Sequence, residues 1–407
     1  MTASTRTIAQ KKPGFFDRLI ERVFRQKLDS ALQKPVTLTL PSGYAFVLGP
    51  SESARSVQWT LSSWNGLWRV LLSGPLGMGE GYINADWSSD DLSELLTRLA
   101  DAMNTGTVET KRWSPSQLIA HVKHATNANS RSGSRRNIEF HYDLGNDFYQ
   151  RWLDRSMTYS SAEFETPDQS LYDAQQVKYR NACEALSLKP GDRVLEIGCG
   201  WGGFAEFAAR HYGCHVTGIT LSHQQLAYAQ KRITEANLSE SVELRLQDYR
   251  DLEGQFDAIV SIEMLEAVGE EHWASYFQQV EKCLKVGGKA SIQVITINAR
   301  DFGGYRSQPD FIQKYIFPGG MLPTNHIVEE AGRAVGLVHV GTTLFGSSYG
   351  KTLALWARSF NAAWPSIQLL GFDARFHRVW NFYLAYCEAG FETDRIDVGR
   401  FVFHKNR

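Results

Sequence analysis

The sequence lacks several features that would assign it to particular classes of protein. No stretch approaches about 18 uninterrupted apolar residues, so no transmembrane helix is predicted. The first residues, MTASTRTIAQKKPGFF, contain no apolar signal core followed by a small-residue cleavage site. The five cysteines form no CxxC pair and no Cys/His cluster, which argues against a disulfide framework, a structural zinc site or another metal centre. We therefore expect a cytoplasmic protein without a metal.

Charge of either sign is not in excess, because 43 Lys and Arg stand against 44 Asp and Glu. This balance gives no reason to expect nucleic-acid binding. Residues 1–36, however, carry eight basic and three acidic side chains. Apolar residues recur there at helical spacing, with arginines between them: Phe15, Phe16, Leu19, Ile20, Val23 and Phe24. The pattern predicts a basic amphipathic helix, which would either lie on a membrane surface or pack against its own domain.

The chain is long enough, at 407 residues, for two or three domains. Residues 36–48 alternate in polarity around the turn signal Pro41-Ser42-Gly43, and residues 57–74 hold two more strand-like runs. Residues 91–103 have helical periodicity, with Ser88, Ser89 or Asp90 as candidate caps. We predict a small α+β domain over residues 1–126, a polar linker over 127–137 and a catalytic domain over 138–407.

Strand-like and helix-like segments alternate from about residue 173 onwards. The predicted strands are residues 193–198, 215–221, 242–247, 256–262 and 289–297, and helical patterns separate most of them. Such alternation predicts an α/β fold with a parallel, doubly wound sheet and right-handed crossovers.

A glycine-rich turn directly follows the first of these strands. Its glycines are Gly198, Gly200 and Gly202, and Glu196 lies two residues before the first. Glycine lets the backbone turn sharply and approach a ligand closely, and ligands bind at the carboxyl ends of strands in doubly wound sheets. The spacing is G-x-G-x-G rather than G-x-G-x-x-G, which favours S-adenosylmethionine over a dinucleotide. Glu196 would receive the methionine ammonium.

The ends of the next two strands offer further contacts to such a ligand. Thr220 and Gln225 are candidates for the ribose hydroxyls, although both are equally suited to the start of a helix that Ser222 caps. Asp248 would accept a hydrogen bond from the adenine amino group, and Tyr249 would stack on the ring. A solvated loop is the alternative reading of Asp248.

Several motifs recur in the order of a known family. They are HYDLGNDFYQRWLD, MTYSSAEF, VLEIGCGWGG, LQDYRDL, KYIFPGG, YGKTLALW and FYLAYCEAGF, spread over residues 141–391. The sequence resembles cyclopropane-fatty-acyl-phospholipid synthases and mycolic acid cyclopropane synthases, and GMGEGYINADW resembles the accessory domain of the full-length enzymes. The resemblance implies a Rossmann-like class I methyltransferase fold, a membrane-associated and commonly dimeric enzyme, and one-carbon transfer from S-adenosylmethionine to the double bond of a phospholipid acyl chain.

The resemblance also implies particular site residues. Tyr159, Ser160 and Cys199 join the donor site. In the family, a bound bicarbonate acts as the base, and the matching positions here are Glu266, Tyr349, Ser161, Gln293, the backbone of Ile262 and a cysteine, Cys387. Cys387 is not required as a nucleophile, because the methyl group passes directly to carbon, and a small buried thiol is the alternative.

Four positions depart from the family pattern. Ser161 replaces a cysteine, Gln293 and Ala267 each replace a histidine, and Leu265 replaces a phenylalanine. Glutamine can donate to an anion but cannot titrate near neutral pH, so bicarbonate and the side chain of Glu266 both stay open as the base. An altered base would redirect the cation from a cyclopropane to a methyl- or methylene-branched or furan-precursor chain. A non-catalytic lipid-binding protein and a small-molecule methyltransferase are the remaining alternatives.

Overall fold

The structure is a computed structural model that describes residues 12–50, 55–104 and 144–407. The chain forms two compact units, which we treat separately. The N-terminal unit holds the described residues up to Asn104 together with Asp373–Thr393, and the large unit holds Leu144–Phe372 and Asp394–Arg407. The predicted linker, residues 127–137, lies outside the described residues. No helix of the described ranges is long and apolar enough to span a bilayer.

The N-terminal unit contains a small mixed sheet in the order β2-β1-β3-β4. The strands are β1 (Val36–Thr39), β2 (Ala45–Leu48), β3 (Val57–Leu61) and β4 (Trp87–Ser89). The predicted hairpin is confirmed, since β1 and β2 pair antiparallel with Val36 opposite Leu48. Val36, Leu38, Val57 and Trp59 are buried, so alternate residues of the strands form the core as the period-two pattern requires.

The second strand-like run expected in residues 57–74 is wrong. Ser63 begins helix α2 (Trp64–Ile83), and its hydroxyl accepts a hydrogen bond from the amide of Gly66 at 3.0 Å. The run contains Trp and Val, which also suit a strand, but the N-cap at Ser63 starts a helix there. Pro75 lies inside α2, and the chain kinks at Gly74, whose φ is +56°.

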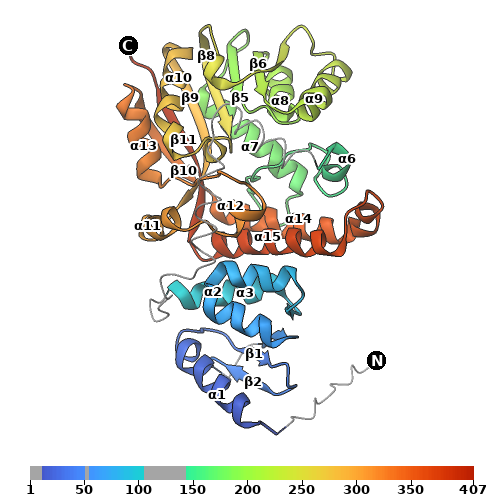
Figure 1. Ribbon diagram of the computed structural model, residues 1–407. Helices are drawn as coiled ribbons and strands as arrows, with labels where there is room; N and C mark the ends of the chain where they lie inside the picture. The colour runs from blue at the N-terminus through green and yellow to red at the C-terminus, as the bar shows by residue number, and fades with distance from the viewer. Residues whose placement is uncertain (1–11, 51–54, 105–143) are drawn as a thin grey trace. The chain divides into compact units, whose positions relative to one another are not determined.

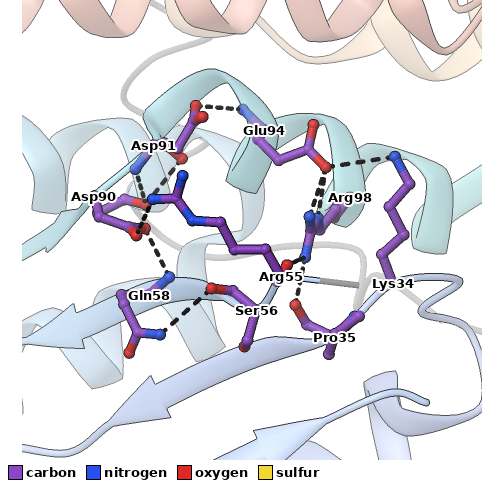
Figure 2. A network of polar contacts seen from close by, with 10 residues as sticks. Lys34, Pro35, Arg55, Ser56, Gln58, Asp90, Asp91, Glu94 and Arg98 are labelled. Atoms are coloured by element: carbon purple, nitrogen blue, oxygen red, sulfur yellow. Dashed lines mark hydrogen bonds and ion pairs between the residues drawn. The ribbon is translucent and has the colours of Figure 1, made fainter. Parts of the chain in front are cut away.

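The predicted helix near residue 91 is confirmed as α3 (Leu92–Asn104), but its cap differs from those expected. The carboxylate of Asp91, rather than Ser88, Ser89 or Asp90, accepts from the amide of Glu94 at 3.1 Å. Figure 2 shows the polar network that joins α3 to the sheet, in which Arg98 pairs with Glu94 at 2.7 Å and donates to the carbonyl oxygen of Pro35. A buried arginine thereby binds both a carboxylate and strand-end carbonyls.

The predicted amphipathic helix is confirmed as α1 (Phe15–Phe24), followed by a π-helical turn, η1 (Arg25–Asp29). Phe24 is buried against Trp59 at 5.9 Å between ring centroids. Phe15 and Phe16 are 79% and 71% exposed. One side of α1 therefore packs on its own unit, and the other exposes apolar rings next to arginines.

The C-terminal helix α15 (Ala374–Glu392) belongs to the N-terminal unit, although the sequence analysis placed it within residues 138–407. Arg378 donates to the backbone oxygens of Tyr82 and Trp87, and Phe382 packs on Tyr82 at 5.8 Å. The aromatic residues of α15 thus serve in part as core for α2 and α3. The predicted limits of the two domains stay a prediction, because the linker between them lies outside the described residues.

The large unit is built on a seven-stranded sheet in the order β10-β11-β9-β8-β5-β6-β7, and Figure 1 shows helices on it. The predicted doubly wound sheet is confirmed, since β5 to β9 are parallel, and β11 pairs antiparallel with β9 and β10. The strands are β5 (Arg193–Ile197), β6 (His215–Thr220), β7 (Val242–Leu246), β8 (Phe256–Ile262), β9 (Leu284–Ile297), β10 (Val338–Leu344) and β11 (Ile396–His404). Chain order reverses between β5 and β8, which is where such sheets bind ligands.

Helices cover both faces of this sheet. The helices of the large unit are α6 (Asn146–Tyr149), α7 (Leu171–Leu186), α8 (Gly203–Tyr212), α9 (His223–Glu235), α10 (Trp273–Cys283), α11 (Ala299–Ser307), α12 (Phe311–Tyr315), α13 (Asn325–Ala334) and α14 (Gly346–Gln368), with short 3-10 turns η2 (Tyr249–Asp251), η3 (Leu265–Ala267) and η4 (Glu270–His272). Val194 of β5 packs in a core with α7 and α8, and its neighbour Leu195 packs in a second core with α10. Successive residues of one strand therefore fill opposite layers.

Candidate functional site

A cavity opens at the carboxyl ends of β5, β6 and β8 in the large unit. Its lining includes most of the predicted donor-binding residues, namely Tyr159, Ser160, Glu196, Gly198, Cys199, Gly200, Thr220, Gln225 and Tyr249. Ile262 and Glu263 line the cavity as well. The cavity therefore lies at the reversal of strand order, where the sequence analysis expected a ligand.

The glycine-rich turn forms one wall of the cavity, and its shape depends on glycine. Gly198 has a φ of +86°, and a Cβ there would lie 3.0 Å from the side chain of Met264. Gly202 has a φ of +81° and starts α8, where a Cβ would lie 3.0 Å from Ala229. These positions combine a left-handed backbone with close packing, so side chains would both strain the turn and fill space at its edges.

Glu196 carries an unpaired oxygen in this cavity. The residue is buried, and its Oε2 has no hydrogen-bond partner. Burial raises the pKa of Glu196 well above its ordinary value, opposed by a hydrogen bond from the backbone of Ala205. An unsatisfied buried carboxylate oxygen is costly unless a ligand supplies the missing donor. A cationic amine such as the methionine ammonium fits this need.

Thr220 and Gln225 lie at the start of a helix and also line the cavity, and their contact with a ribose stays a prediction. Ser222 caps α9, as the alternative reading expected, by accepting from the amide of Gln225 at 3.2 Å. The hydroxyl of Thr220 donates to the side-chain oxygen of Gln225 at 2.8 Å, and both residues line the cavity. The cap thus fixes the position of the polar groups that a ribose would meet.

The two adenine candidates differ in placement. Tyr249 lines the cavity, and its ring lies 5.5 Å from that of Tyr276. Asp248 is not part of the lining, and its carboxylate binds the guanidinium of Arg250 at 2.6 Å. Hydrogen bonding of Asp248 to adenine stays a prediction.

A buried lysine that the sequence analysis missed supports the segment around Ser160. Lys178, on α7, is fully buried, and its ammonium donates to the hydroxyl of Ser160 at 2.6 Å. Burial lowers the pKa of Lys178 to about 8, opposed by the charges of Glu263 and Glu163. In the sequence, the position of Lys178 on its helix does not differ from that of a solvent-exposed lysine, so only the fold shows that it faces the site.

The base region of the site is built around Glu263, which the sequence analysis also missed. One carboxylate oxygen accepts from the backbone amide of Ser161 and from the side chain of Gln293, both at 2.8 Å. The other oxygen accepts from the hydroxyl of Tyr349 at 2.6 Å. Ser161, Gln293 and Tyr349 are three of the predicted anion-binding residues. The structure therefore brings these three residues together, but they bind the carboxylate of Glu263 rather than a separate anion.

Glu263 stands at the end of β8, in an uncommon backbone conformation. Its φ is +51°, in the left-handed region that non-glycine residues rarely adopt. Its amide donates to the backbone oxygen of Gln293 at 2.8 Å. The backbone holds the carboxylate in place at a cost in strain, and residue spacing alone gives no signal of this conformation.

Glu266 lies behind this cluster with a different set of partners. One of its oxygens accepts from the amide of Ile295 at 2.6 Å. Ile262, the predicted backbone donor to the anion, lines the cavity, and that role stays a prediction. Burial and the charge of Glu263 raise the pKa of Glu266 to about 8. Three donors stabilise the charge on Glu263 and one does so on Glu266, so the proton of the pair resides on Glu266 at neutral pH.

These contacts test whether the site fits a bound bicarbonate. The backbone of Ser161, Gln293 and Tyr349 are the groups that the family resemblance assigned to the anion, and each donates to Glu263. A second anion at the same donors would meet a buried carboxylate, and like charges at such distances repel strongly. The residues present do not fit bicarbonate.

A row of aromatic rings runs from the cavity lining to Tyr349, which binds Glu263. Tyr159, which lines the cavity, packs on Trp356 with centroids 5.2 Å apart, and Trp356 meets Tyr349 edge to face at 6.1 Å. Aromatic faces stabilise nearby cations through their quadrupoles. Cys387 lies on α15, in the N-terminal unit, and is partly exposed; its role stays a prediction.

The sequence is similar to known proteins over most of its length. A family model described as mycolic acid cyclopropane synthetase matches residues 129–401. The tuberculostearic acid methyltransferase UfaA1 of Mycobacterium tuberculosis is 38% identical over 338 residues, covering 81% of this chain and 79% of that protein. The cyclopropane-fatty-acyl-phospholipid synthase of Escherichia coli is 37% identical over 345 residues, covering 83% and 85%.

A solved structure is similar as well. The crystal structure of mycolic acid cyclopropane synthase CmaA1 complexed with SAH and CTAB matches with a TM-score of 0.63 and 30% identity. The match covers 67% of this chain and 98% of that one. Together with the strand order, this similarity confirms the predicted Rossmann-like class I methyltransferase fold.

Proposed function

The chain belongs to the mycolic acid cyclopropane synthetase family, and from this premise we propose that it transfers a one-carbon unit to the double bond of an unsaturated acyl chain of a membrane phospholipid, forming a cyclopropane. It is an S-adenosylmethionine-dependent methyltransferase, as the sequence analysis predicted, and S-adenosylmethionine is its methyl donor. The observation that carries the proposal is one cavity lined both by Glu196, which has an oxygen without a hydrogen-bond partner, and by Glu263.

The donor would be held by groups that already line the cavity. Glu196 would receive the ammonium, Thr220 and Gln225 the ribose, and Tyr249 the adenine ring. Tyr159 and the glycine-rich turn would enclose the sulfonium end of the donor. This arrangement matters because an alkene is a weak nucleophile, so its carbon must be held close to and in line with the sulfonium methyl while water is excluded.

The transfer forms a carbon–carbon bond and breaks the sulfur–methyl bond. S-adenosylhomocysteine leaves with the electron pair of the broken bond, and a carbocation remains on the acyl chain. Tyr159 lines the cavity, where its aromatic face would stabilise the cation, and it packs on Trp356, which in turn meets Tyr349. A base then removes a proton from the added methyl group, and the released electron pair closes the three-membered ring.

A second product has its own support. A hydride shift moves the cation to the carbon that bears the added methyl group. Loss of a proton from that methyl group then gives a methylene branch, and loss of a proton from the neighbouring chain carbon gives a methyl-branched chain that keeps a double bond. The replacement of two family histidines by Gln293 and Ala267, and the presence of Glu263, alter the base region on which this choice depends. The relative UfaA1 is named as a methyltransferase rather than a cyclopropane synthase.

The membrane part of the proposal rests on α1. Its exposed Phe15, Phe16 and Leu19 lie among Arg18 and Arg22, which suits a surface of anionic phospholipid. We propose that the protein works at the cytoplasmic face of a membrane, with α1 as an attachment helix. A homodimer remains a prediction from the family resemblance.

Analysis of the lipid product tests the proposed function. The protein is incubated with S-adenosylmethionine and vesicles of a mono-unsaturated phospholipid, and the acyl chains are examined by mass spectrometry before and after mild hydrogenation. A chain that gains one carbon and takes up no hydrogen is the cyclopropane. A chain that gains one carbon and still takes up hydrogen supports the branched product, and unchanged chains contradict both.

A further inference from the structure

We propose that the carboxylate of Glu263 is a resident base that takes the place of an exogenous bicarbonate, so that the enzyme needs no bound anion for turnover. The inference deepens the proposed function and rests on it. It concerns a residue that sequence reasoning did not single out, and it replaces both base candidates of the sequence analysis, bicarbonate and Glu266.

The hydrogen bonds of Glu263 carry the inference. Three groups from three separate parts of the large unit converge on its two oxygens: the amide of Ser161, the amide side chain of Gln293 on β9, and the hydroxyl of Tyr349 on α14. All three distances are between 2.6 and 2.8 Å. Convergent donors of this kind make an anion-binding site, and here the anion is covalently attached to the chain.

The position of Glu263 suits a base for the proposed reaction. It lines the same cavity as Glu196 and the glycine-rich turn, next to Ile262 and Met264. Its left-handed backbone, with a φ of +51°, places the side chain at the very end of β8. Strained residues that persist at a site require surroundings that hold them there, and the three donors to the carboxylate provide that support.

Of the two neighbouring carboxyl groups, Glu263 and Glu266, Glu263 is the one that stays ionised. Glu266 holds the proton of the carboxyl pair, since its pKa is raised to about 8 by burial and by the charge of Glu263. Burial raises the pKa of Glu263, and the charge of Lys178 together with the hydrogen bonds from Tyr349, Ser161 and Gln293 opposes that rise. The cluster therefore contains one carboxylate, one carboxylic acid and one ammonium, and the carboxylate is the member that lines the cavity with its donors attached.

The proposed step is balanced without any further reagent. After methyl transfer, an oxygen of Glu263 takes a proton from the added carbon, and the electron pair of that carbon–hydrogen bond forms the second bond to the cationic carbon. Glu263 becomes a neutral acid and returns the proton to solvent before the next turnover. In the branched alternative, a hydride shift first moves the cation to the carbon that bears the added methyl group. The same carboxylate then takes a proton from that methyl group or from the neighbouring chain carbon, and the released electron pair forms a double bond.

A purely structural role is the competing account of Glu263, because its carboxylate also ties Ser161 to α14. Two substitutions separate the accounts. Glu263→Gln keeps the size of the side chain and removes its charge. Glu263→Gly removes the side chain and opens the donors to a small anion, and glycine adopts a φ of +51° without strain.

The experiment measures methyl transfer to unsaturated phospholipid vesicles in buffer depleted of carbon dioxide, with and without added bicarbonate. We expect wild-type turnover to be insensitive to bicarbonate, and Glu263→Gln turnover to fall about 100-fold or more in both conditions. Glu263→Gly should be equally inactive without the anion and should recover at least about tenfold with it. Glu240→Gln, at an exposed carboxylate away from the cavity, should match the wild type.

Calorimetry of S-adenosylmethionine binding accompanies each variant, so that loss of folding is recognised. Wild-type turnover that depends on bicarbonate would contradict the inference while leaving the proposed function intact. A Glu263→Gln variant that retains turnover, or a folded Glu263→Gly variant that bicarbonate does not rescue, would also overturn it. A wild-type protein that methylates no lipid in either buffer would instead refute the proposed function.

Discussion

Two glutamates that line the same cavity have opposite surroundings. Glu196, beside the glycine-rich turn, has an oxygen with no partner, whereas both oxygens of Glu263 are bound by donors from the protein. An unsatisfied buried carboxylate gains its missing hydrogen bond from a ligand, and a satisfied one needs no ligand to be stable. On the proposed assignment, the donor half of the site is therefore incomplete without S-adenosylmethionine, while the base half is complete as it stands.

The largest expected effect separates these two roles by kinetics. Glu263→Gln should lower kcat about 100-fold or more, because it removes the base, and should leave the Kd for S-adenosylmethionine within about threefold. Glu266→Gln should lower kcat less than about tenfold, because glutamine mimics the protonated acid. Steady-state kinetics and calorimetry measure both quantities. A larger loss in Glu266→Gln than in Glu263→Gln would assign the base to Glu266.

The reverse pattern is expected at Glu196. Glu196→Gln should raise the Kd for S-adenosylmethionine about 10- to 100-fold, since a charge-assisted hydrogen bond to the ammonium is lost. Calorimetry provides the measurement, and Glu206→Gln on the neighbouring helix α8, whose carboxylate instead pairs with Arg210 and Arg232, serves as the control. Unchanged affinity in Glu196→Gln would remove this residue from the donor site.

Lys178 links the two halves, and its removal should have an intermediate effect. Lys178→Met loses the hydrogen bond to Ser160 and should lower kcat about tenfold through misplacement of the Ser160–Ser161 segment. Because the pKa of Lys178 is about 8, wild-type kcat should decline above that pH as the ammonium loses its proton, and the variant should lack this decline. Lys231→Met, at an exposed lysine on α9, is the control. Identical pH profiles in variant and wild type would exclude Lys178 as a positioning residue.

The sequence predicted the glycine-rich turn and the helix cap far better than the surroundings of Glu263, for physical reasons. The turn at Gly198–Gly202 and the cap at Ser222 are local features, so spacing along the chain is enough to find them. The surroundings of Glu263 depend on hydrogen bonds from Gln293 and Tyr349, which are 30 and 86 residues away in the sequence. Its left-handed backbone leaves no mark in residue type, and the nearby family motif draws attention to Glu266 instead.

The same distinction explains the misread segment of the N-terminal unit. The hairpin around Pro41-Ser42-Gly43 has an unambiguous local signal and was predicted correctly. Residues 64–74 combine Trp, Leu and Val, which suit a strand or a buried helix equally, and the cap at Ser63 decided for the helix.

A smaller effect is expected at the membrane. Phe15→Ser combined with Phe16→Ser should weaken binding to anionic phospholipid vesicles about 5- to 10-fold, because two exposed rings no longer enter the lipid, and should leave the Kd for S-adenosylmethionine unchanged. Vesicle co-sedimentation gives the measurement. Val286→Ser, at a 65% exposed residue of β9, controls for loss of any exposed apolar side chain. Equal weakening by the control would deny α1 a specific role.

The smallest expected effect concerns stability. The pKa of Glu266 is about 8 in the folded protein against an ordinary 4.5, so the folded state keeps a proton that the unfolded state releases. The resulting contribution to stability is complete below pH 4.5 and is lost as pH rises through 8. Glu266→Gln avoids this loss, and its Tm relative to wild type should rise by a few degrees between pH 5 and pH 8. A constant difference in Tm would mean that Glu266 titrates normally.

Bicarbonate rescue of Glu263→Gly tests the central claim most directly, because it asks whether the protein carries its own anion at the base site. The account predicts a wild-type enzyme indifferent to bicarbonate and a glycine variant that methylates unsaturated phospholipid only when bicarbonate is supplied. A wild-type enzyme that stops in bicarbonate-free buffer, or a glycine variant that turns over without the anion, would contradict it.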